Sequence, residues 1–169
     1  MNPYEGGKRI AELGSKRINN LLISSSAAYL SDYINMPEAV WFGDNIPPTL
    51  VLEMTTSCIN QGWNGIVNGG FTAKLIDLVG GTAAAVVADQ QFDKMIVLKH
   101  SELDYHMAIP INKTILTVAQ VESVEAENRA ITTLVRVMST DKTTVYTTGT
   151  LFLRIIDFVR LSNENSLRT

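Results

Sequence analysis

A long apolar stretch, residues 71–88, constrains the fold of this chain more than any other feature. The stretch is rich in Ala and Leu and is too long for one strand, so it predicts a buried helix. A helix that is apolar around most of its circumference has to be covered on nearly all sides. The rest of the chain is therefore expected to wrap around this helix.

Four strand-like segments follow the predicted helix. The first alternates in part, the other three are rich in Val, Ile, Thr and Leu, and they span residues 96–108, 114–124, 130–138 and 144–156. Short polar breaks between them indicate antiparallel hairpins, since a parallel sheet would need helical crossovers. With a further strand expected at residues 49–57, the pattern predicts an α+β fold, an antiparallel sheet of five or six strands wrapped around one central helix.

The segment before this unit is expected to be mostly helical. Residues 7–33 show helical spacing of apolar positions with a break near 24–26. Residues 35–48 are predicted to be an irregular connection, because they contain three prolines and a glycine. The expected organisation is an N-terminal helical extension with its connecting loop (1–48), one domain (49–160) and a flexible polar tail (161–169).

Composition excludes several functional classes. Of 169 residues, 46% are apolar and only 18% are charged, which excludes a disordered chain and hints at oligomerisation. Fourteen Lys and Arg against 17 Asp and Glu supply no basic patch for nucleic acid or an anionic membrane. No apolar run reaches the roughly 18 residues of a membrane span. Glu5 and Glu12 argue against a leader peptide, so we expect a cytoplasmic protein, with mitochondria as the alternative.

Cysteine and histidine are scarce. The single cysteine, Cys58, excludes an intramolecular disulfide and a Cys-rich metal site, and it is expected to be a buried, inert thiol at the end of a strand. His100 and His106 are expected to be ordinary strand residues on one face. The sequence therefore predicts neither a metal site nor a cofactor.

The predicted helix carries one carboxylate, Asp77, with small residues around it. The positions three, four and seven away are Gly70, Ala73, Lys74, Gly80, Gly81 and Ala84. Two glycines in mid-helix cost about 1 kcal/mol each relative to Ala, which favours a second helix or a ligand lying against this stripe. The alternative is a solvated Asp77 paired with Lys74, with the two glycines marking a helix end.

The helix opens with Asn68, Gly69 and Gly70. Glycines there leave backbone N–H groups uncovered at the positive end of the helix dipole, which can bind a developing oxyanion; the alternative is that they only turn the chain into the helix. Gly69 and Asp77 lie about 12 Å apart along one helix, whereas both groups must lie about 3 Å from a reacting carbonyl. Two antiparallel copies of the helix would bring Asp77 of one chain to the glycines of the other, so this site requires a homo-oligomer.

Residues 68–77, NGGFTAKLID, resemble the His-Gly-Gly-(x)6-Asp motif of hotdog-fold acyl-CoA thioesterases of the PaaI type, including the THEM2-like branch. The segments 50–54 and 103–110 stand where that family has strands, although Tyr105 and Pro110 are further apart than in its Tyr-x-x-Pro pattern. The resemblance covers about residues 49–154. It implies a hotdog fold and hydrolysis of a fatty or aryl acyl-CoA by a homodimer or a dimer-of-dimers tetramer.

The resemblance also implies roles for individual residues. Asp77 would be the nucleophile or the general base for water, and the Gly69 N–H, helped by Gly70, would polarise the thioester carbonyl. Asn64, Asn60 or Gln61 would hold the water or the thioester. Trp63 and Phe71 would line an acyl pocket or pack in the core. The CoA phosphates would need cations, for which Lys74, Lys99 and Lys113 are candidates, with solvated surface positions as the alternative.

Three positions depart from the family pattern. Asn68 replaces the His and can position a group but cannot carry a proton. Gly62 stands where the branch often has Asn, and Leu98 where it often has Ser or Thr, with Lys99 and Ser101 nearby. These departures leave open a non-catalytic hotdog protein that binds acyl-CoA or a protein partner. A hotdog dehydratase would need a His on the helix or its entry loop, where this chain has none.

Overall fold

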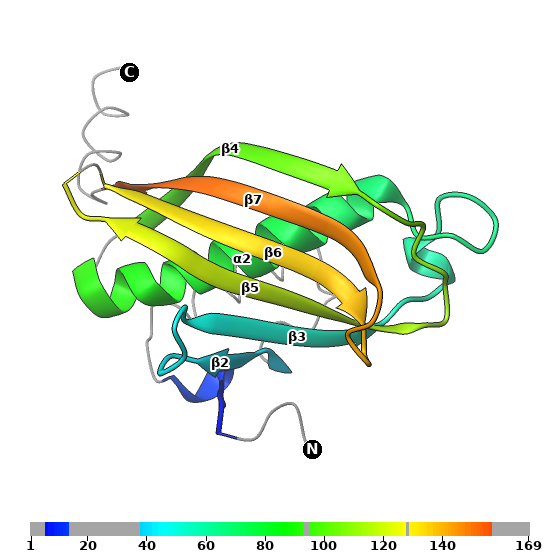
Figure 1. The fold of residues 1–169 in the computed structure, drawn as a ribbon, viewed down its shortest axis with the longest axis horizontal. Coiled ribbons are helices and arrows are strands. Elements are labelled where there is room, and N and C mark those ends of the chain that lie inside the picture. The colour runs from blue at the N-terminus through cyan, green and yellow to red at the C-terminus, as the bar shows by residue number, and fades with distance from the viewer. Residues whose placement is uncertain (1–5, 14–37, 93–94, 128, 157–169) are drawn as a thin grey trace, which may run out of the picture.

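The computed structural model describes residues 6–13, 38–92, 95–127 and 129–156. They form one antiparallel sheet around one long helix (Figure 1). The helix is α2 (Gly69–Phe92), and two short 3-10 helices are η1 (Ile10–Glu12) and η4 (Cys58–Asn60). The strands are β1 (Lys8–Arg9), β2 (Val40–Phe42), β3 (Thr49–Thr55), β4 (Met95–Tyr105), β5 (Thr114–Glu125), β6 (Ala130–Ser139) and β7 (Val145–Ile156).

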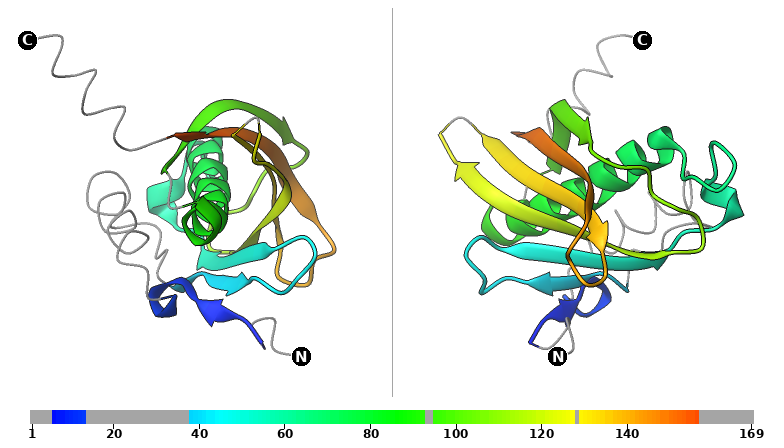
Figure 2. Two further views of the ribbon diagram at one scale, coloured as in Figure 1. Left: turned by 90° about the vertical axis from the view of Figure 1, so that its left-hand side faces the viewer. Right: turned by 45° about the vertical axis from the view of Figure 1, so that its right-hand side comes forward.

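The strand order in the sheet is β1-β2-β3-β5-β6-β7-β4. The chain leaves β3, runs through α2 along the concave face, and returns as β4 at the opposite edge of the sheet. Figure 2 shows the sheet curling around the helix. The predicted α+β hotdog architecture is thus confirmed, and the helix and the five longer strands lie where the sequence predicts them.

The sheet has seven strands rather than the predicted five or six. The additional strands, β1 and β2, fall in residues 7–33 and 35–48, which were predicted to be helical and irregular. They extend the sheet beyond the expected domain boundary at residue 49, because β2 pairs with β3 and β1 pairs with β2. Strands of two and three residues are too short to show an alternating pattern. The remainder of the predicted extension and the tail lie outside the described residues.

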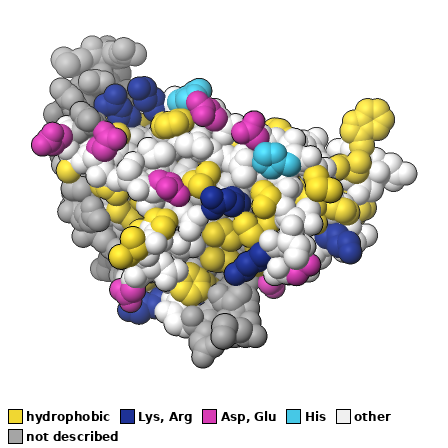
Figure 3. Space-filling view, in the orientation of Figure 1, with side chains coloured by type: hydrophobic (Ala, Val, Ile, Leu, Met, Phe, Trp, Pro, Cys, Tyr) yellow, Lys and Arg dark blue, Asp and Glu magenta, His cyan; other side chains and the backbone are white. Residues whose placement is uncertain are grey.

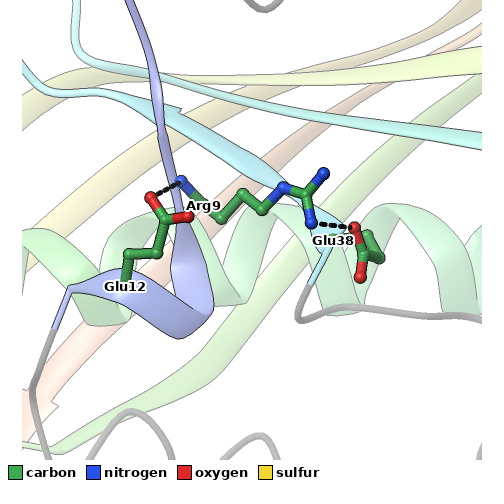
Figure 4. A network of polar contacts seen from close by, with 3 residues as sticks. All are labelled: Arg9, Glu12 and Glu38. Carbon is green, nitrogen blue, oxygen red and sulfur yellow. Dashed lines mark hydrogen bonds and ion pairs between the residues drawn. The ribbon is translucent and has the colours of Figure 1, made fainter.

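The described N-terminal segment is fixed to the sheet by polar and apolar contacts. The Arg9 guanidinium lies 3.0 Å from the Glu38 carboxylate, and the Arg9 backbone N–H donates to Glu12 at 3.3 Å (Figure 4). Ile10 follows directly and is fully buried in the main core, where its N–H donates to the Ala39 carbonyl. Burial of Ile10, rather than the exposed ion pair, is the stabilising contribution here.

The core lies between α2 and the concave face of the sheet. Leu75, Ile76 and Val79 of the helix are fully buried there. Glycine allows the two layers to approach closely, since a Cβ on Gly149 of β7 would lie 2.7 Å from the Ile76 side chain. Gly80 of the helix meets β6 in the same way, with a Cβ position 2.7 Å from the Val135 side chain.

Helix α2 is long and apolar enough, by length and composition, to cross a membrane between Gly69 and Ala88. This segment nearly coincides with the apolar stretch of residues 71–88, in which Lys74 and Asp77 are the charged positions. In the structure 61% of that segment is buried inside the domain. Its apolar character is accounted for by its place as the core helix.

Candidate active site

The start of α2 is held in place by the side chain and backbone of Asn68. The Asn68 Oδ1 accepts a hydrogen bond from the Gly70 N–H at 2.7 Å, and the Asn68 carbonyl accepts from the Thr72 N–H at 3.1 Å. The Asn68 N–H donates to the Asn60 carbonyl at 2.7 Å. Asn68 is therefore the N-cap of the helix, a position at which Asn is strongly preferred.

This cap gives different roles to Gly69 and Gly70, which were both predicted to be oxyanion donors. The Gly70 N–H is occupied by Asn68, so it does not point freely into solvent. The Gly69 N–H has no hydrogen-bond partner among the described residues, and Gly69 is exposed. A free N–H at the positive end of a helix dipole can stabilise an oxyanion. Gly69 alone is thus the candidate donor of this chain.

The peptide of Gly69 is also fixed from the other side. The Tyr105 hydroxyl, at the end of β4, donates to the Gly69 carbonyl oxygen at 3.0 Å. The Gly69–Gly70 peptide group is thus held at both of its polar atoms, the carbonyl oxygen by Tyr105 and the N–H by Asn68, directly next to the free Gly69 N–H of the preceding peptide group. In the sequence, Tyr105 stands out only through the family pattern, since no local signal indicates a contact across 36 residues.

Gly62 explains one departure from the family pattern. A Cβ at Gly62 would lie 3.0 Å from Asn68 Cα and 3.3 Å from Asn68 Nδ2, so a side chain there would require the cap to shift by a few tenths of an ångström. Asn60, considered as a substitute, is buried and accepts from the Ser57 N–H at 3.0 Å, so it serves the loop itself. Asn64 and Gln61 are exposed on the loop.

Asp77 lies two turns along α2 on a face turned away from the sheet. Its side chain is exposed in the single chain, yet partial burial among its neighbours raises the pKa of the carboxyl above the ordinary value. The small residues predicted to surround Asp77 do not all share its face of the helix. Ala73, Lys74 and Gly81 are partly or fully exposed with Asp77, whereas Gly80 and Ala84 are buried. Gly80 serves the packing against β6, so its helix-propensity cost has a reason other than a ligand.

A pocket of about 240 Å³ lies beside the start of the helix. It is enclosed by the beginning of α2, by the chain that leaves β4 and by the beginning of β7; the lining residues are Val67, Gly69, Thr72, Tyr105, His106, Met107, Ala108, Ile109 and Thr147. Of the lining residues from Tyr105 onwards, the sequence links only Tyr105 to the site, through the resemblance to the family. Gly69 is thus both the candidate oxyanion donor and part of the pocket wall.

Two of the predicted pocket aromatics are placed differently. Phe71 packs partly buried against the main core, which agrees with one of its two expected roles. Trp63 is 84% exposed, so within one chain it neither packs in the core nor lines the pocket. Hydrophobic side chains project from the end of the molecule that carries the loop between η4 and α2 (Figure 3).

The remaining candidates lie on the surface. Lys74, Lys99 and Lys113 are exposed, on α2, on β4 and before β5. Cys58 is exposed at the start of η4, so the prediction of a buried thiol at a strand end is wrong. The chain turns into a 3-10 helix there and leaves the side chain outside.

The polar neighbours of both histidines lie on the strands of the sheet. The His106 Nε2 lies 2.9 Å from the Thr148 hydroxyl, and His100 lies 3.5 Å from Glu102. His100 belongs to β4, as predicted, whereas His106 follows directly after its end. Within the described residues, no three His, Cys, Asp or Glu side chains come together as a possible metal-binding group.

Comparisons with known proteins agree with this geometry. Several solved structures share the fold at low sequence identity. The yhdA protein of Lactococcus lactis matches at 13% identity and a TM-score of 0.66, covering 76% of this chain and 98% of that one. Zebrafish thioesterase superfamily member 2 matches at 18% identity and a TM-score of 0.62, covering 82% of this chain and 96% of that one. An acyl-CoA hydrolase from Staphylococcus aureus, in complex with butyryl-CoA and CoA, matches at 14% identity and a TM-score of 0.57. The match covers 65% of this chain and 64% of that one.

The family model of the thioesterase superfamily matches residues 64–148. This match spans half of the chain and includes the N-cap, α2, β4, β5, β6 and the beginning of β7. Among curated proteins, none matches the sequence. The chain therefore belongs to the thioesterase superfamily.

Proposed function

We propose that this chain hydrolyses the thioester bond of a fatty or aryl acyl-CoA in a site assembled from two subunits. The observation that carries the proposal is the free Gly69 N–H at the exposed start of α2, next to a peptide group that Asn68 and Tyr105 hold in place. A pre-set N–H donor is what a thioester carbonyl needs as negative charge develops on its oxygen.

The second element is Asp77, which would act on water. Asp77 takes a proton from a water molecule as the water oxygen attacks the thioester carbon, and the Gly69 N–H stabilises the resulting oxyanion. The carbon–sulfur bond then breaks, and the proton passes to the CoA thiolate, leaving a free acid and CoA. The raised pKa of Asp77 makes it a stronger base once it is ionised. Direct attack by the carboxylate is the alternative route.

Two copies of the chain would be needed, because about 12 Å of helix separates Gly69 from Asp77. The edge of the sheet supports such a pair. Within the described residues, β4 pairs only with β7, so eleven residues of β4 present an open edge. Val97 and Leu98 on that strand are 41% and 43% exposed, which is typical of a surface that a second copy covers.

The proposed substrate class is supported by the family and by the chemistry of the donor. The S. aureus structural neighbour is an acyl-CoA hydrolase bound to butyryl-CoA and CoA, which supports a CoA thioester as substrate here. The exposed Lys74, Lys99 and Lys113 are the candidates for binding the CoA phosphates. Asn68 contributes as the helix cap and takes no part in proton transfer.

A panel of acyl-CoA thioesters assayed with purified protein tests the proposal. We expect release of free CoA by the wild type and at least a 100-fold lower rate with Asp77→Asn. Equal rates for the two proteins would exclude the proposed mechanism. Binding of acyl-CoA by the wild type without any hydrolysis would instead establish the non-catalytic alternative.

A further inference from the structure

One residue of the wall of the pocket beside Gly69 has a buried hydroxyl group that the fold leaves without a partner. Thr147, at the start of β7, is 1% exposed, and its Oγ1 makes no hydrogen bond in the structure. Leaving a buried hydroxyl unpaired costs free energy, so such a group calls for an explanation. Here the hydroxyl belongs to a residue of the pocket wall.

Three residues with hydroxyl groups line the pocket, and the other two hydroxyls are already engaged. The Thr72 Oγ1 donates to the Asn68 carbonyl at 3.3 Å, and the Tyr105 hydroxyl donates to the Gly69 carbonyl at 3.0 Å. Thr147 alone among these three retains both its donor and its acceptor capacity. Most of the remaining lining residues are apolar, namely Val67, Met107, Ala108 and Ile109.

The position of Thr147 ties it to the candidate oxyanion donor. Thr147 is the direct register partner of Tyr105 in the pairing of β7 with β4. Side chains of directly paired residues stand about 5 Å apart at Cβ, so Thr147 lies beside the residue that contacts Gly69. A substituent only a few bonds from a carbonyl held at Gly69 would therefore enter the part of the pocket next to Thr147.

Pocket size limits what can enter. Typical small-molecule pockets enclose about 300–1,000 Å³, and this one encloses about 240 Å³. The pocket is open on one side, and this volume accommodates a short acyl group. A small volume, apolar walls and one unpaired hydroxyl suit a short acyl group with a single oxygen substituent.

We propose that Thr147 is a specificity-determining residue that recognises a hydroxyl substituent on a short acyl chain. This inference rests on the proposed thioesterase function and adds the class of acyl group. The chain would prefer a hydroxylated short-chain acyl-CoA over the unsubstituted acyl-CoA of the same length. The Thr147 Oγ1 would donate to, or accept from, the substrate hydroxyl, so that neither hydroxyl is left unpaired in the complex.

The chain itself offers a matched control for the test. Thr133 of β6 is also fully buried, and its Oγ1 also has no hydrogen-bond partner, but it pairs with Leu151 and does not line the pocket. Replacing either threonine with valine keeps the shape and removes an unpaired hydroxyl. Thr147→Val and Thr133→Val should therefore affect folding similarly, and only the first should alter substrate choice.

The experiment compares 3-hydroxybutyryl-CoA with butyryl-CoA, and 3-hydroxyhexanoyl-CoA with hexanoyl-CoA, in the full-length wild type and both variants. We expect kcat/KM of the wild type to favour at least one hydroxylated member about 10-fold, this ratio to fall to about 1 in Thr147→Val, and Thr133→Val to keep it. Thermal unfolding of the variants checks that both remain folded.

A wild type that shows no preference in either pair overturns the inference, and so does a ratio that survives in Thr147→Val. An equal fall in Thr133→Val would show a general effect of the core and also overturn it. Calorimetric binding of the same four thioesters separates this inference from the proposed function. If no thioester is hydrolysed, a Thr147-dependent binding preference still supports it, and equal or absent binding overturns it.

Discussion

The Tyr105 hydroxyl donates a hydrogen bond to the carbonyl oxygen of Gly69 at 3.0 Å, which joins the end of β4 to the first residue of α2. The same glycine has the free N–H that the proposed mechanism uses. The bond fixes the Gly69–Gly70 peptide group, and the donor N–H lies in the adjoining Asn68–Gly69 peptide group. The backbone next to the donor therefore depends on a strand that follows it in the chain by more than 30 residues.

Tyr105→Phe removes this hydrogen bond and leaves the ring. Tyr105 would act as a positioning residue, so we expect kcat to fall by up to about 10-fold, with KM nearly unchanged. Tyr146→Phe is the control, because the Tyr146 hydroxyl has no hydrogen-bond partner among the described residues. Steady-state kinetics of both variants measures the effect. A parallel loss in the two variants would contradict a positioning role for Tyr105.

Gly69→Pro removes the N–H itself. Proline is well tolerated at the first position of a helix, and an added Cβ at Gly69 would meet Tyr105 only at 3.8 Å, so the fold should persist. We expect a loss of about 10²–10³ in kcat. Gly69→Ala keeps the N–H and should retain most of the activity. Circular dichroism verifies folding, and full activity of the proline variant would disprove the donor role.

Asp77→Asn should abolish turnover without unfolding the protein. Burial raises the pKa of Asp77, so the folded state binds its proton more readily than the unfolded state does. Stability therefore decreases as the pH rises from the unfolded pKa through the folded pKa. Asparagine does not ionise, so the variant should be at least as stable as the wild type at pH 7, with the difference vanishing at lower pH.

Thermal unfolding of both proteins from pH 3 to pH 8 measures this difference. In the wild type, kcat/KM should fall on the acid side at a pH above the ordinary pKa of an aspartate, because Asp77 must be ionised to act. An acid limb below that value, or a variant that is less stable only at neutral pH, would contradict the assigned environment of Asp77.

Gly81→Leu tests the second subunit. A Cβ at Gly81 meets nothing within 4 Å in the single chain, and Leu favours a helix more than Gly does, so the monomer should fold at least as well. Gly81 shares the exposed face with Asp77, where a second copy of α2 would pack. We expect weaker association by sedimentation and a parallel loss of activity. A fully associated and active variant would exclude packing of a partner helix here.

Asn68→Ala tests the helix cap. Loss of the Asn68 side chain leaves the Gly70 N–H without its acceptor and should lower the free energy of unfolding by about 0.5–2 kcal/mol. Asn68→Asp keeps an acceptor and should retain stability, while its charge beside the Gly69 N–H should disfavour an oxyanion and reduce kcat. Urea unfolding measures the first effect. An alanine variant as stable as the wild type would contradict the capping role.

Local patterns predicted the larger elements well. The apolar run gave the helix, and segments rich in Val, Ile and Thr gave five of the seven strands, because periodicity and propensity act over neighbouring residues. The short strands β1 and β2 have no such signal, since their two and three residues are fixed by pairing, β2 with β3 and β1 with β2. The exposed positions of Cys58 and Trp63 also depend on how the loop leaves the sheet, which its composition does not indicate.

Helical spacing placed six residues near Asp77 but could not tell which of them face the sheet. Gly80 and Gly81 are neighbours in sequence, yet one packs against Val135 and Leu151 and the other has open space above it. The direction of the sheet relative to the helix decides this difference. It is set by contacts with strands that come much later in the chain.

The sequence by itself determined a core helix, an antiparallel sheet to cover it, and the two chemical groups of the motif, Gly69 and Asp77. These follow from spacing and side-chain type, which are local properties. Only the tertiary structure decided that Asn68 occupies the Gly70 N–H, that Tyr105 holds the Gly69 carbonyl, and that Thr147 lines the pocket with an unpaired hydroxyl. Hydrogen-bond partners of that kind depend on how strands and helix pack, and packing is a property of the whole domain.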